Sequence, residues 1–407
     1  MKKARKDSFA IICLIFFMLN TLSFAASDDT KNLPEKNGIE QIELKTIGMD
    51  KLLSDSFASG DDIVPGKMVV KFKNNKIRLQ EGSIRGLNMV QSVEQVDNRG
   101  IVEIDIKKDT DLFETMEVLK NHPEIEYAEP LYIYKAFGEQ TGQAVTVAEA
   151  VYEPDDTYYT KKWQWGLQAI SVDSIWDRVP LEQRSAITIA VIDTGVDIDH
   201  PDLCENIVNG YDFVGNDSNA DDDNGHGTHV AGIAAAVPYN GTGIAGVAGG
   251  ARIMPVKVLD ENGSGNSLDL YLGIIYAVNH GADVINLSLG SVYPSLLIEE
   301  AVEYALSKDV VVVAATGNDG SDKVSYPAAF EGVIGVGAVD YYDGNKFELP
   351  SFSNRGDEVD LTAPGVDIIS TIPYELDIFD GNQDGYALKN GTSMAAPFVA
   401  GMAALLR

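Results

Sequence analysis

Near its end the chain reads Asn390-Gly391-Thr392-Ser393-Met394-Ala395-Ala396-Pro397. The first two are turn residues, and the small apolar residues that follow predict a helix from Met394 to Leu406. Thr392 or Ser393 is expected to cap the first turn of this helix. A serine hydroxyl at that position also lies in the positive end of the helix dipole, which stabilises the negative charge formed when serine attacks a carbonyl. A capping serine without chemistry is the alternative.

The composition limits the classes of partner. The 407 residues include 31 basic and 62 acidic side chains, a net charge of −31, and 45% of the chain is hydrophobic. A chain this acidic repels phosphate, so we expect no nucleic-acid partner. The length and hydrophobic content fit two or three domains, and the charge suits a soluble exported protein that carries hard cations.

Residues 1–26 predict a secretion signal. A basic start is followed by an apolar run, Phe9 to Leu19, that is too short for a membrane span, and small residues end the segment. We therefore expect a secreted, extracellular protein with no stable membrane span after signal removal; an uncleaved anchor is the alternative. Once the signal is removed, Cys204 is the one cysteine left, so no intramolecular disulfide forms, and we interpret it as a small core residue.

The next three segments differ in pattern. Residues 27–61 are polar without a sustained period and predict a flexible lead. Residues 62–137 contain three alternating stretches and one helical stretch, 109–122, which together predict a small α+β domain. Residues 138–155 are rich in Gly, Thr, Ala and Glu and predict a linker with a site of proteolytic maturation.

Residues 156–407 alternate between apolar runs and helical patterns. The apolar runs end near residues 192, 259, 287, 315 and 336. Such runs predict strands that are buried on both faces of a parallel sheet, and their alternation with helices predicts one α/β domain. Ligands of these sheets bind beyond the carboxyl ends of the strands.

Polar residues follow several of these strands. Asp193 comes directly after the first run, His226 lies between two glycines, and Asn318 follows a later run. With Ser393 they supply an acid, a base, an oxyanion donor and a nucleophile. Plainer interpretations exist. Asp193 could cap a helix, and His226 with His229 could bind a metal, although no carboxylate stands at the spacing that zinc peptidases use.

Three motifs resemble the signatures of the subtilisin-like serine proteases, the subtilases. They are Asp193-Thr194-Gly195, Gly225-His226-Gly227-Thr228-His229 and Gly391-Thr392-Ser393-Met394-Ala395-Ala396-Pro397. The resemblance covers about residues 156–407 and implies a subtilisin-like parallel sheet with helices on both faces. It also implies that Asp193 orients His226, that His226 is general base and then acid, and that Ser393 is the nucleophile. Asn318 would complete the oxyanion hole.

Residues 62–137 resemble the inhibitory propeptide of the same family, a ferredoxin-like domain whose C-terminal tail lies in the active-site cleft. The resemblance implies a self-processing zymogen with its own propeptide as inhibitor, and protein or peptide substrates that bind as an added β-strand. It implies that Ser288-Leu289-Gly290 and Ala315-Thr316-Gly317 contact the substrate, and small residues there leave room for a large side chain. We expect self-cleavage between Tyr134 and Asp156.

The resemblance also implies Ca²⁺ as a cofactor. The tight calcium site of the family is expected to use oxygen atoms of Asp156, Asp202, Val237, Asn240, Thr242 and Ile244. A second, weaker site of some members is expected at Asp212, Asp217, Asn219 and Asp221. Oxygen ligands on loops suit this hard ion. A solvated acidic loop is the alternative at the second site.

The expectation from the sequence is a secreted, calcium-stabilised serine endopeptidase made as an inactive precursor. A non-catalytic peptide-binding protein on the same fold is the alternative, which the intact set of four candidate catalytic residues disfavours. The catalytic domain of a subtilase continues past the serine motif. The sequence therefore predicts that the domain at 156–407 is truncated at its C-terminus or belongs to a longer protein.

Overall fold

The computed structural model describes residues 62–73, 84, 89–137, 154–342, 346–378 and 382–407. The predicted signal (1–26), the predicted flexible lead (27–61) and most of the predicted linker (138–153) lie outside the described residues. In the part of the chain that is described, no helix is long and apolar enough to cross a membrane.

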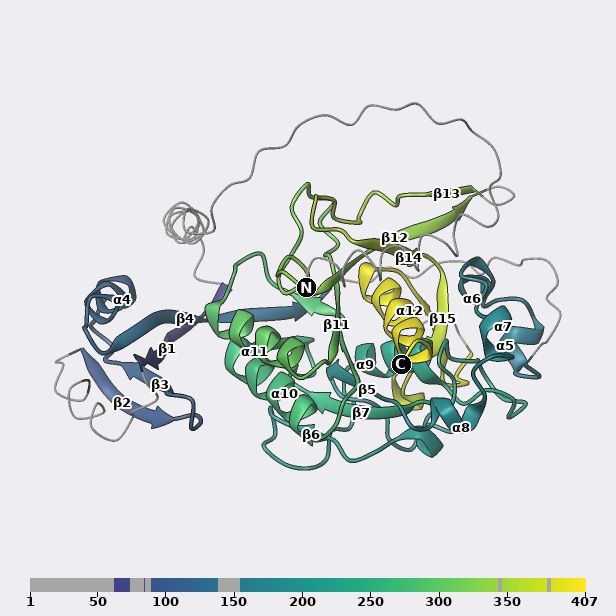
Figure 1. The fold of residues 1–407 in the computed structure, drawn as a ribbon, viewed down its shortest axis with the longest axis horizontal. Coiled ribbons are helices and arrows are strands. Elements are labelled where there is room, and N and C mark those ends of the chain that lie inside the picture. Colours follow the sequence, from purple (N-terminus) through teal and green to yellow (C-terminus); the bar gives the residue numbers. More distant parts are fainter. Residues whose placement is uncertain (1–61, 74–83, 85–88, 138–153, 343–345, 379–381) are drawn as a thin grey trace. The chain divides into compact units, whose positions relative to one another are not determined.

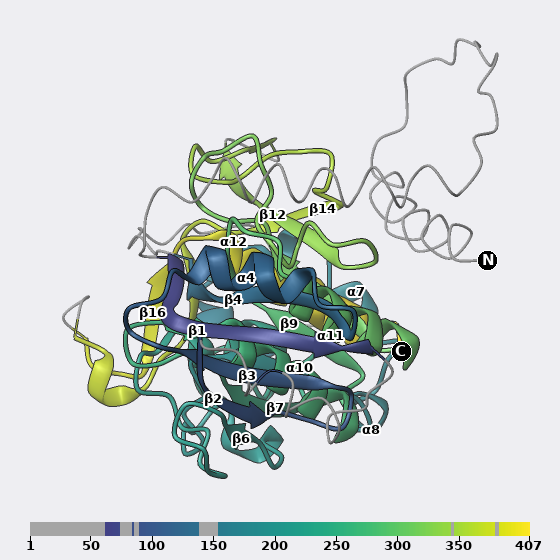
Figure 2. The ribbon, with the colours of Figure 1, turned by 90° about the vertical axis from the view of Figure 1, so that its left-hand side faces the viewer.

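In its described residues, the N-terminal domain is an antiparallel sheet with helix α4 (Leu112–Lys120) beside it. Its strands are β1 (Ile63–Phe72), β2 (Val90–Gln95), β3 (Ile101–Ile106) and β4 (Ile125–Ala136). The strand order β4-β1-β3-β2 is that of a ferredoxin-like domain, as expected, and Figure 2 shows β1, β3 and β2 side by side. Val102 and Ile104 are buried on one face of β3, in the same core as Met116 and Leu119 of α4. This one-sided burial produces the alternating sequence pattern.

The C-terminal domain is built on an eight-stranded sheet. Its strands are β5 (Thr188–Asp193), β6 (Tyr211–Asp212), β7 (Arg252–Lys257), β9 (Val284–Leu287), β11 (Val311–Ala315), β12 (Ile334–Tyr342), β13 (Lys346–Glu348) and β14 (Leu361–Pro364). The order is β13-β12-β11-β9-β5-β7-β6, with β14 also beside β12. All pairings are parallel except that of β13 with β12. Every residue of β5 is buried, which explains the continuous apolar run.

Four long helices cover this sheet: α9 (His226–Ala235), α10 (Ser267–Asn279), α11 (Leu296–Ser307) and α12 (Thr392–Leu405). Helices α10 and α11 pack together on one face, and α9 and α12 pack together on the other (Figure 1). The predicted doubly covered parallel sheet is therefore confirmed. Helix α9 begins at the candidate base itself, because Gly225 is its N-cap.

The remaining elements are short. They are α5 (Thr157–Thr160), α6 (Trp165–Ala169), α7 (Asp173–Trp176), α8 (Leu181–Arg184), β8 (Ser264–Asn266), β10 (Leu289–Gly290), β15 (Ile368–Thr371), β16 (Tyr386–Lys389) and two 3₁₀ turns, η3 (Cys204–Asn206) and η4 (Tyr374–Leu376). The interpretation of Cys204 as a core residue is wrong: it begins a surface 3₁₀ turn and is exposed.

Candidate active site

Asp193 and His226 meet between the end of β5 and the start of α9. Asp193 Oδ1 lies 2.7 Å from His226 Nδ1 and also accepts the backbone N–H of Thr194 at 2.8 Å. Asp193 is fully buried, and His226 is 2% exposed. Because a carboxylate only accepts, the proton of the ring is on Nδ1, and Nε2 is the nitrogen that can take a proton.

His229, one turn further along α9, has a different role. It is buried, and its Nε2 donates to the backbone oxygen of Ala387 at 3.0 Å. Burial, helped by the charge of Lys389, lowers the pKa of His229 well below its ordinary value, so the ring is neutral. Among the described residues no group of three or more His, Cys, Asp or Glu side chains is arranged to hold a metal ion. The bond to Ala387 thus fixes the ring of His229 inside the fold.

Ser393 is in the first turn of α12. Its Oγ donates to the backbone oxygen of Ser288 at 2.9 Å, and Ser288 Oγ donates to the backbone oxygen of Ser393 at 2.8 Å. The expectation that Thr392 or Ser393 caps the helix is wrong, because Gly391 is the N-cap and no side chain caps it. The Thr392 hydroxyl bonds instead to Asn318, which follows β11, and the Ser393 hydroxyl bonds to Ser288, which follows β9. The turn is therefore held by tertiary contacts.

Asn318 lies next to this turn, just after β11. Its Oδ1 accepts the backbone N–H and the hydroxyl of Thr392, each at 2.9 Å. Since a backbone N–H can only donate, the oxygen of the amide is on this side, and Nδ2 is directed elsewhere. Gly317 follows the same strand and donates its N–H to Thr392 Oγ1 at 3.1 Å. These contacts fix the orientation of the Asn318 amide.

The predicted substrate segment at Ser288–Gly290 contacts the N-terminal domain. Within it, β10 pairs antiparallel with β4: Leu289 lies opposite Ala136, and Gly290 lies opposite Lys135. On the other edge of β4, β8 pairs antiparallel, with Ser264 opposite Lys135, and the Gly263 carbonyl accepts the Ala136 N–H at 2.9 Å. The end of β4 is therefore the middle strand of three. Ser288–Gly290 is one of the two segments that flank β4, and the other, β8, was not expected from the sequence.

The second predicted substrate segment, Ala315-Thr316-Gly317, lies where β11 ends. All three residues are buried, and Thr316 and Gly317 are held by hydrogen bonds to Asn354. On the other segment, a Cβ added to Gly290 would lie 2.5 Å from the Phe137 ring. Gly290 thus leaves the space that this large side chain occupies.

Polar contacts also join the two domains. The carboxylate of Glu129, on β4, accepts from Ser295 Oγ at 2.7 Å and from the N–H groups of Leu296 and Leu297 at 3.0 and 3.1 Å. It therefore caps the N-terminus of α11, where an anion is favoured. Burial raises the pKa of Glu129, and these three donors oppose that shift. Elsewhere on the interface, Lys71 Nζ bonds to Glu300 at 2.6 Å.

The first predicted calcium set comes together around two buried carboxylates. Asp202 accepts from Asn240 Nδ2 at 2.7 Å and from the Ile244 N–H at 2.8 Å, and its backbone oxygen accepts from Val237. Burial, with the nearby charge of Asp156, raises the pKa of Asp202 to about 6. Asp156 Oδ1 is buried and accepts no hydrogen bond from the described residues. A buried carboxylate oxygen without a hydrogen-bond donor, beside a second carboxylate, suits the coordination of a cation.

The second predicted set is arranged differently. Asp212 accepts the N–H groups of Val214 and Gly215 at 2.7 and 2.8 Å, and Asp217 accepts that of Asn219 at 2.7 Å. Asp212 and Asp217 share one turn, whereas Asp221 accepts a long bond of 3.4 Å from Ile198. Calcium at this second set stays a prediction.

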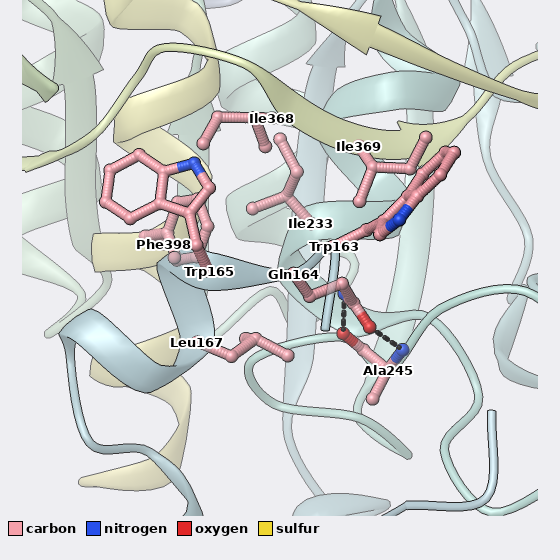
Figure 3. A pocket seen from close by; sticks show the side chains of 10 residues that line it. Trp163, Gln164, Trp165, Leu167, Ile233, Ala245, Ile368, Ile369 and Phe398 are labelled. Atoms are coloured by element: carbon pink, nitrogen blue, oxygen red, sulfur yellow. Dashed lines mark hydrogen bonds between the residues drawn. The ribbon is translucent and has the colours of Figure 1, made fainter. Parts of the chain in front are cut away.

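A separate apolar pocket lies beside α6 (Figure 3). Its lining includes Trp163, Leu167, Ile233, Ile368 and Phe398. The carboxamide of Gln164 is bonded to the backbone N–H and carbonyl of Ala245.

Comparisons with known proteins agree with this geometry. Residues 184–407 match the model of the subtilase family, and residues 56–130 match that of the fervidolysin N-terminal prodomain. The chain is 46% identical over 344 residues to the thermophilic serine proteinase of Bacillus sp. (strain AK1), covering 84% of this chain and 78% of that protein. It is also 46% identical over 255 residues to thermitase of Thermoactinomyces vulgaris, covering 63% of this chain and 85% of that protein.

A solved structure is similar over both domains. The crystal structure of fervidolysin from Fervidobacterium pennivorans, described as a keratinolytic enzyme related to subtilisin, superposes with a TM-score of 0.73 at 31% identity. The similarity covers 86% of this chain and 55% of that one, so the chain spans about half the length of this relative.

Proposed function

This chain belongs to the subtilase family of serine proteases, and on that premise we propose that it hydrolyses peptide bonds with Asp193, His226 and Ser393 as its triad. The observation that carries the proposal is the 2.7 Å contact between buried Asp193 and buried His226. A carboxylate at Nδ1 holds the imidazole in the tautomer whose Nε2 accepts the serine proton, and it stabilises the imidazolium that forms.

The reaction follows from these positions. Ser393 Oγ turns from the Ser288 carbonyl to His226 Nε2, gives up its proton and attacks the substrate carbonyl. The oxyanion accepts from Asn318 Nδ2 and from the backbone N–H of Ser393. His226 then returns the proton to the leaving amine, and water hydrolyses the acyl-enzyme by the same steps.

The peptide lies between β8 and β10 as an added strand. The end of β4 supports this proposal, because its main chain pairs with both segments as an extended substrate would. The prodomain is then an inhibitor that occupies the cleft in the manner of a substrate. Once the prodomain dissociates, protein and peptide substrates form the same main-chain hydrogen bonds with β8 and β10.

The pairing also indicates where the precursor cuts itself. Leu289 lies opposite Ala136, so the next residue of the tail, Phe137, lies opposite Ser288. Ser288 is the residue that exchanges hydrogen bonds with Ser393. We therefore place the scissile bond between Phe137 and Gly138, inside the predicted maturation region.

Sequencing the N-terminus of the processed protein tests this assignment. A mature form that begins at Gly138, or that has been trimmed from there, is expected, together with a separate prodomain that ends at Phe137. An active preparation that still begins near Ser27 would contradict it. A Ser393→Ala precursor that is cut at the same bond would show that another protease is responsible.

Two further proposals complete the function. Ca²⁺ binds to Asp156, Asp202 and Asn240 and to backbone oxygens of Val237, Thr242 and Ile244; the buried Asp156 oxygen supports this. The ion supplies positive charge that holds these loops in the folded domain. The chain is also exported, because residues 1–26 have the pattern of a secretion signal.

Hydrolysis of casein by the mature protein tests the enzymatic proposal. The parent is expected to cleave casein, and Ser393→Ala is expected to lose activity by several orders of magnitude while keeping its fold. A folded parent without activity would favour the alternative, a peptide-binding protein on the same fold.

A further inference from the structure

We propose that Asp222 is a positioning residue that fixes the geometry between Asp193 and His226. The inference rests on the proposed function. Asp222 precedes the candidate base by four residues, and its side chain is 7% exposed. It does not touch the reacting atoms, so its effect passes through the residues that it holds.

The carboxylate of Asp222 accepts five hydrogen bonds. Oδ1 accepts from Thr194 Oγ1 at 2.8 Å and from the N–H groups of Asn224 and Gly225 at 3.0 and 2.9 Å. Oδ2 accepts from the N–H and the hydroxyl of Thr228 at 2.9 and 2.6 Å. Burying a carboxylate is costly unless it is bonded in this way, so the side chain is committed to one position.

Two of these bonds replace the cap that helix α9 lacks. Its N-cap is Gly225, which has no side chain to accept the N–H groups of the first turn. Asp222 accepts from Gly225 and from Thr228, on either side of His226. An anion at a helix N-terminus is stabilising, and here it fixes the backbone that carries the imidazole.

The bond to Thr194 connects this turn with the acid. Thr194 follows Asp193 directly, and its Oγ1 donates to Asp222 while accepting the N–H of Gly227 at 2.9 Å. The two segments touch here, since a Cβ on Gly227 would lie 2.0 Å from the backbone oxygen of Gly195. One buried carboxylate thus joins the residue after the acid to the residues on both sides of the base.

Loss of Asp222 should therefore displace the imidazole from Asp193 and from Ser393. Small displacements of a catalytic group lower turnover strongly, because the proton transfers need short, aligned contacts. In the proposed complex the peptide pairs with β8 and β10. None of the five hydrogen bonds of Asp222 given above goes to either strand, so substrate binding should be retained. The expected signature is a fall in kcat at nearly constant KM.

Three single variants and one double variant test the proposal: Asp222→Asn, Thr194→Val, Thr194→Ser and Asp222→Asn with Thr194→Val. Each precursor is matured with tagged parent enzyme, which is then removed. Active sites are counted with a fluorophosphonate, so that misfolded protein does not enter kcat. Asp222→Asn and Thr194→Val should lower kcat by about 10–100-fold, the cost of a small misplacement.

Two controls separate positioning from a merely structural role. Thr194→Ser keeps the hydroxyl and should stay within about twofold of the parent. In the double variant the loss of kcat should be smaller than the product of the two single losses, because the bond between Asp222 and Thr194 is lost in both single variants. Losses that multiply in the double variant, or a loss confined to KM or to the number of active sites, would overturn the proposal.

The two Thr194 variants test the proposal even if Asp222→Asn does not fold. Thr194→Val lacks the hydroxyl that bonds to Asp222 and Thr194→Ser keeps it, so equal kcat values for the two would overturn the proposal. A parent that neither labels nor cleaves would instead refute the proposed function. An active parent with a fully active Asp222→Asn variant refutes the positioning role alone.

Discussion

Ser288 and Ser393 exchange two hydrogen bonds, each donating its hydroxyl to the backbone oxygen of the other at 2.8 and 2.9 Å. Ser288 directly precedes the short strand that pairs with the end of the prodomain. Asn286, on β9, donates to Ser288 Oγ at 2.9 Å and ties the pair to the central sheet. The segment proposed to bind the peptide and the turn that carries the proposed nucleophile are therefore one connected unit. This connection sets the register from which we place the scissile bond.

Gly290→Ala should change the side-chain preference at the cleaved bond. The added Cβ would lie 2.5 Å from where the Phe137 ring lies, so it reduces the space for a large residue. We expect kcat/KM for a peptide cleaved after Phe to fall about tenfold relative to a matched peptide cleaved after Ala, within the range that pocket contacts of this size control. Equal losses on the two peptides would show that Gly290 does not line this pocket.

Asn318 should matter for turnover more than for binding. Asn318→Leu removes the amide donor together with the acceptor for Thr392, whereas Asn318→Asp keeps that acceptor and removes the donor. Both should lower kcat by at least about 10²–10³, the magnitude known for losing this donor in subtilisin itself. Steady-state kinetics on one peptide decide the matter: a change in KM alone would make Asn318 a binding residue.

Calcium should raise the thermal stability of the protein. An ion that binds the folded state alone stabilises it by mass action, and chelation should lower Tm. Asp156→Asn should remove most of this calcium dependence, because its Oδ1 is buried and has no hydrogen-bond donor among the described residues. Asp155→Asn is the matched control, since Asp155 is exposed. A Tm that chelator does not move would count against both predicted sites.

Glu129→Gln should weaken inhibition by the prodomain. The substitution removes the charge that caps α11 and leaves a single oxygen for three donors. Truncating a buried, charged hydrogen-bonding group costs roughly 2–5 kcal/mol, mainly in the dissociation rate, so the processed complex should become active at least about tenfold sooner. Glu126→Gln, exposed on the same strand, should behave as the parent does. An unchanged lag before activity would exclude Glu129 as an anchor.

The sequence predicted what depends on local pattern. The apolar runs indicated the strands, and the residues that follow them, such as Asp193 and Asn318, were expected at the carboxyl ends of a parallel sheet. The structure brings Asp193 and His226 together, and their part in catalysis stays a prediction.

The sequence could not show what depends on tertiary contacts. Thr392 and Ser393 look like helix caps, but their hydroxyls bond to Asn318 and Ser288, which lie far away in the chain. The segment Ser264–Asn266 is too short to have a pattern, and it is a strand because β4 pairs with it. Asp222 lies in an acidic run that resembles a solvated loop, and its burial depends on Thr194 and Thr228.

Reaction of the mature protein with a fluorophosphonate, followed by peptide mapping, shows directly which serine is the nucleophile. We expect one label per active site, on Ser393. The label should be absent from Ser393→Ala and should form several orders of magnitude more slowly in His226→Ala, because the serine is then not deprotonated. Correctly folded protein that takes up no label, or takes it up on another serine, would contradict the assignment of Asp193, His226 and Ser393 as a catalytic triad.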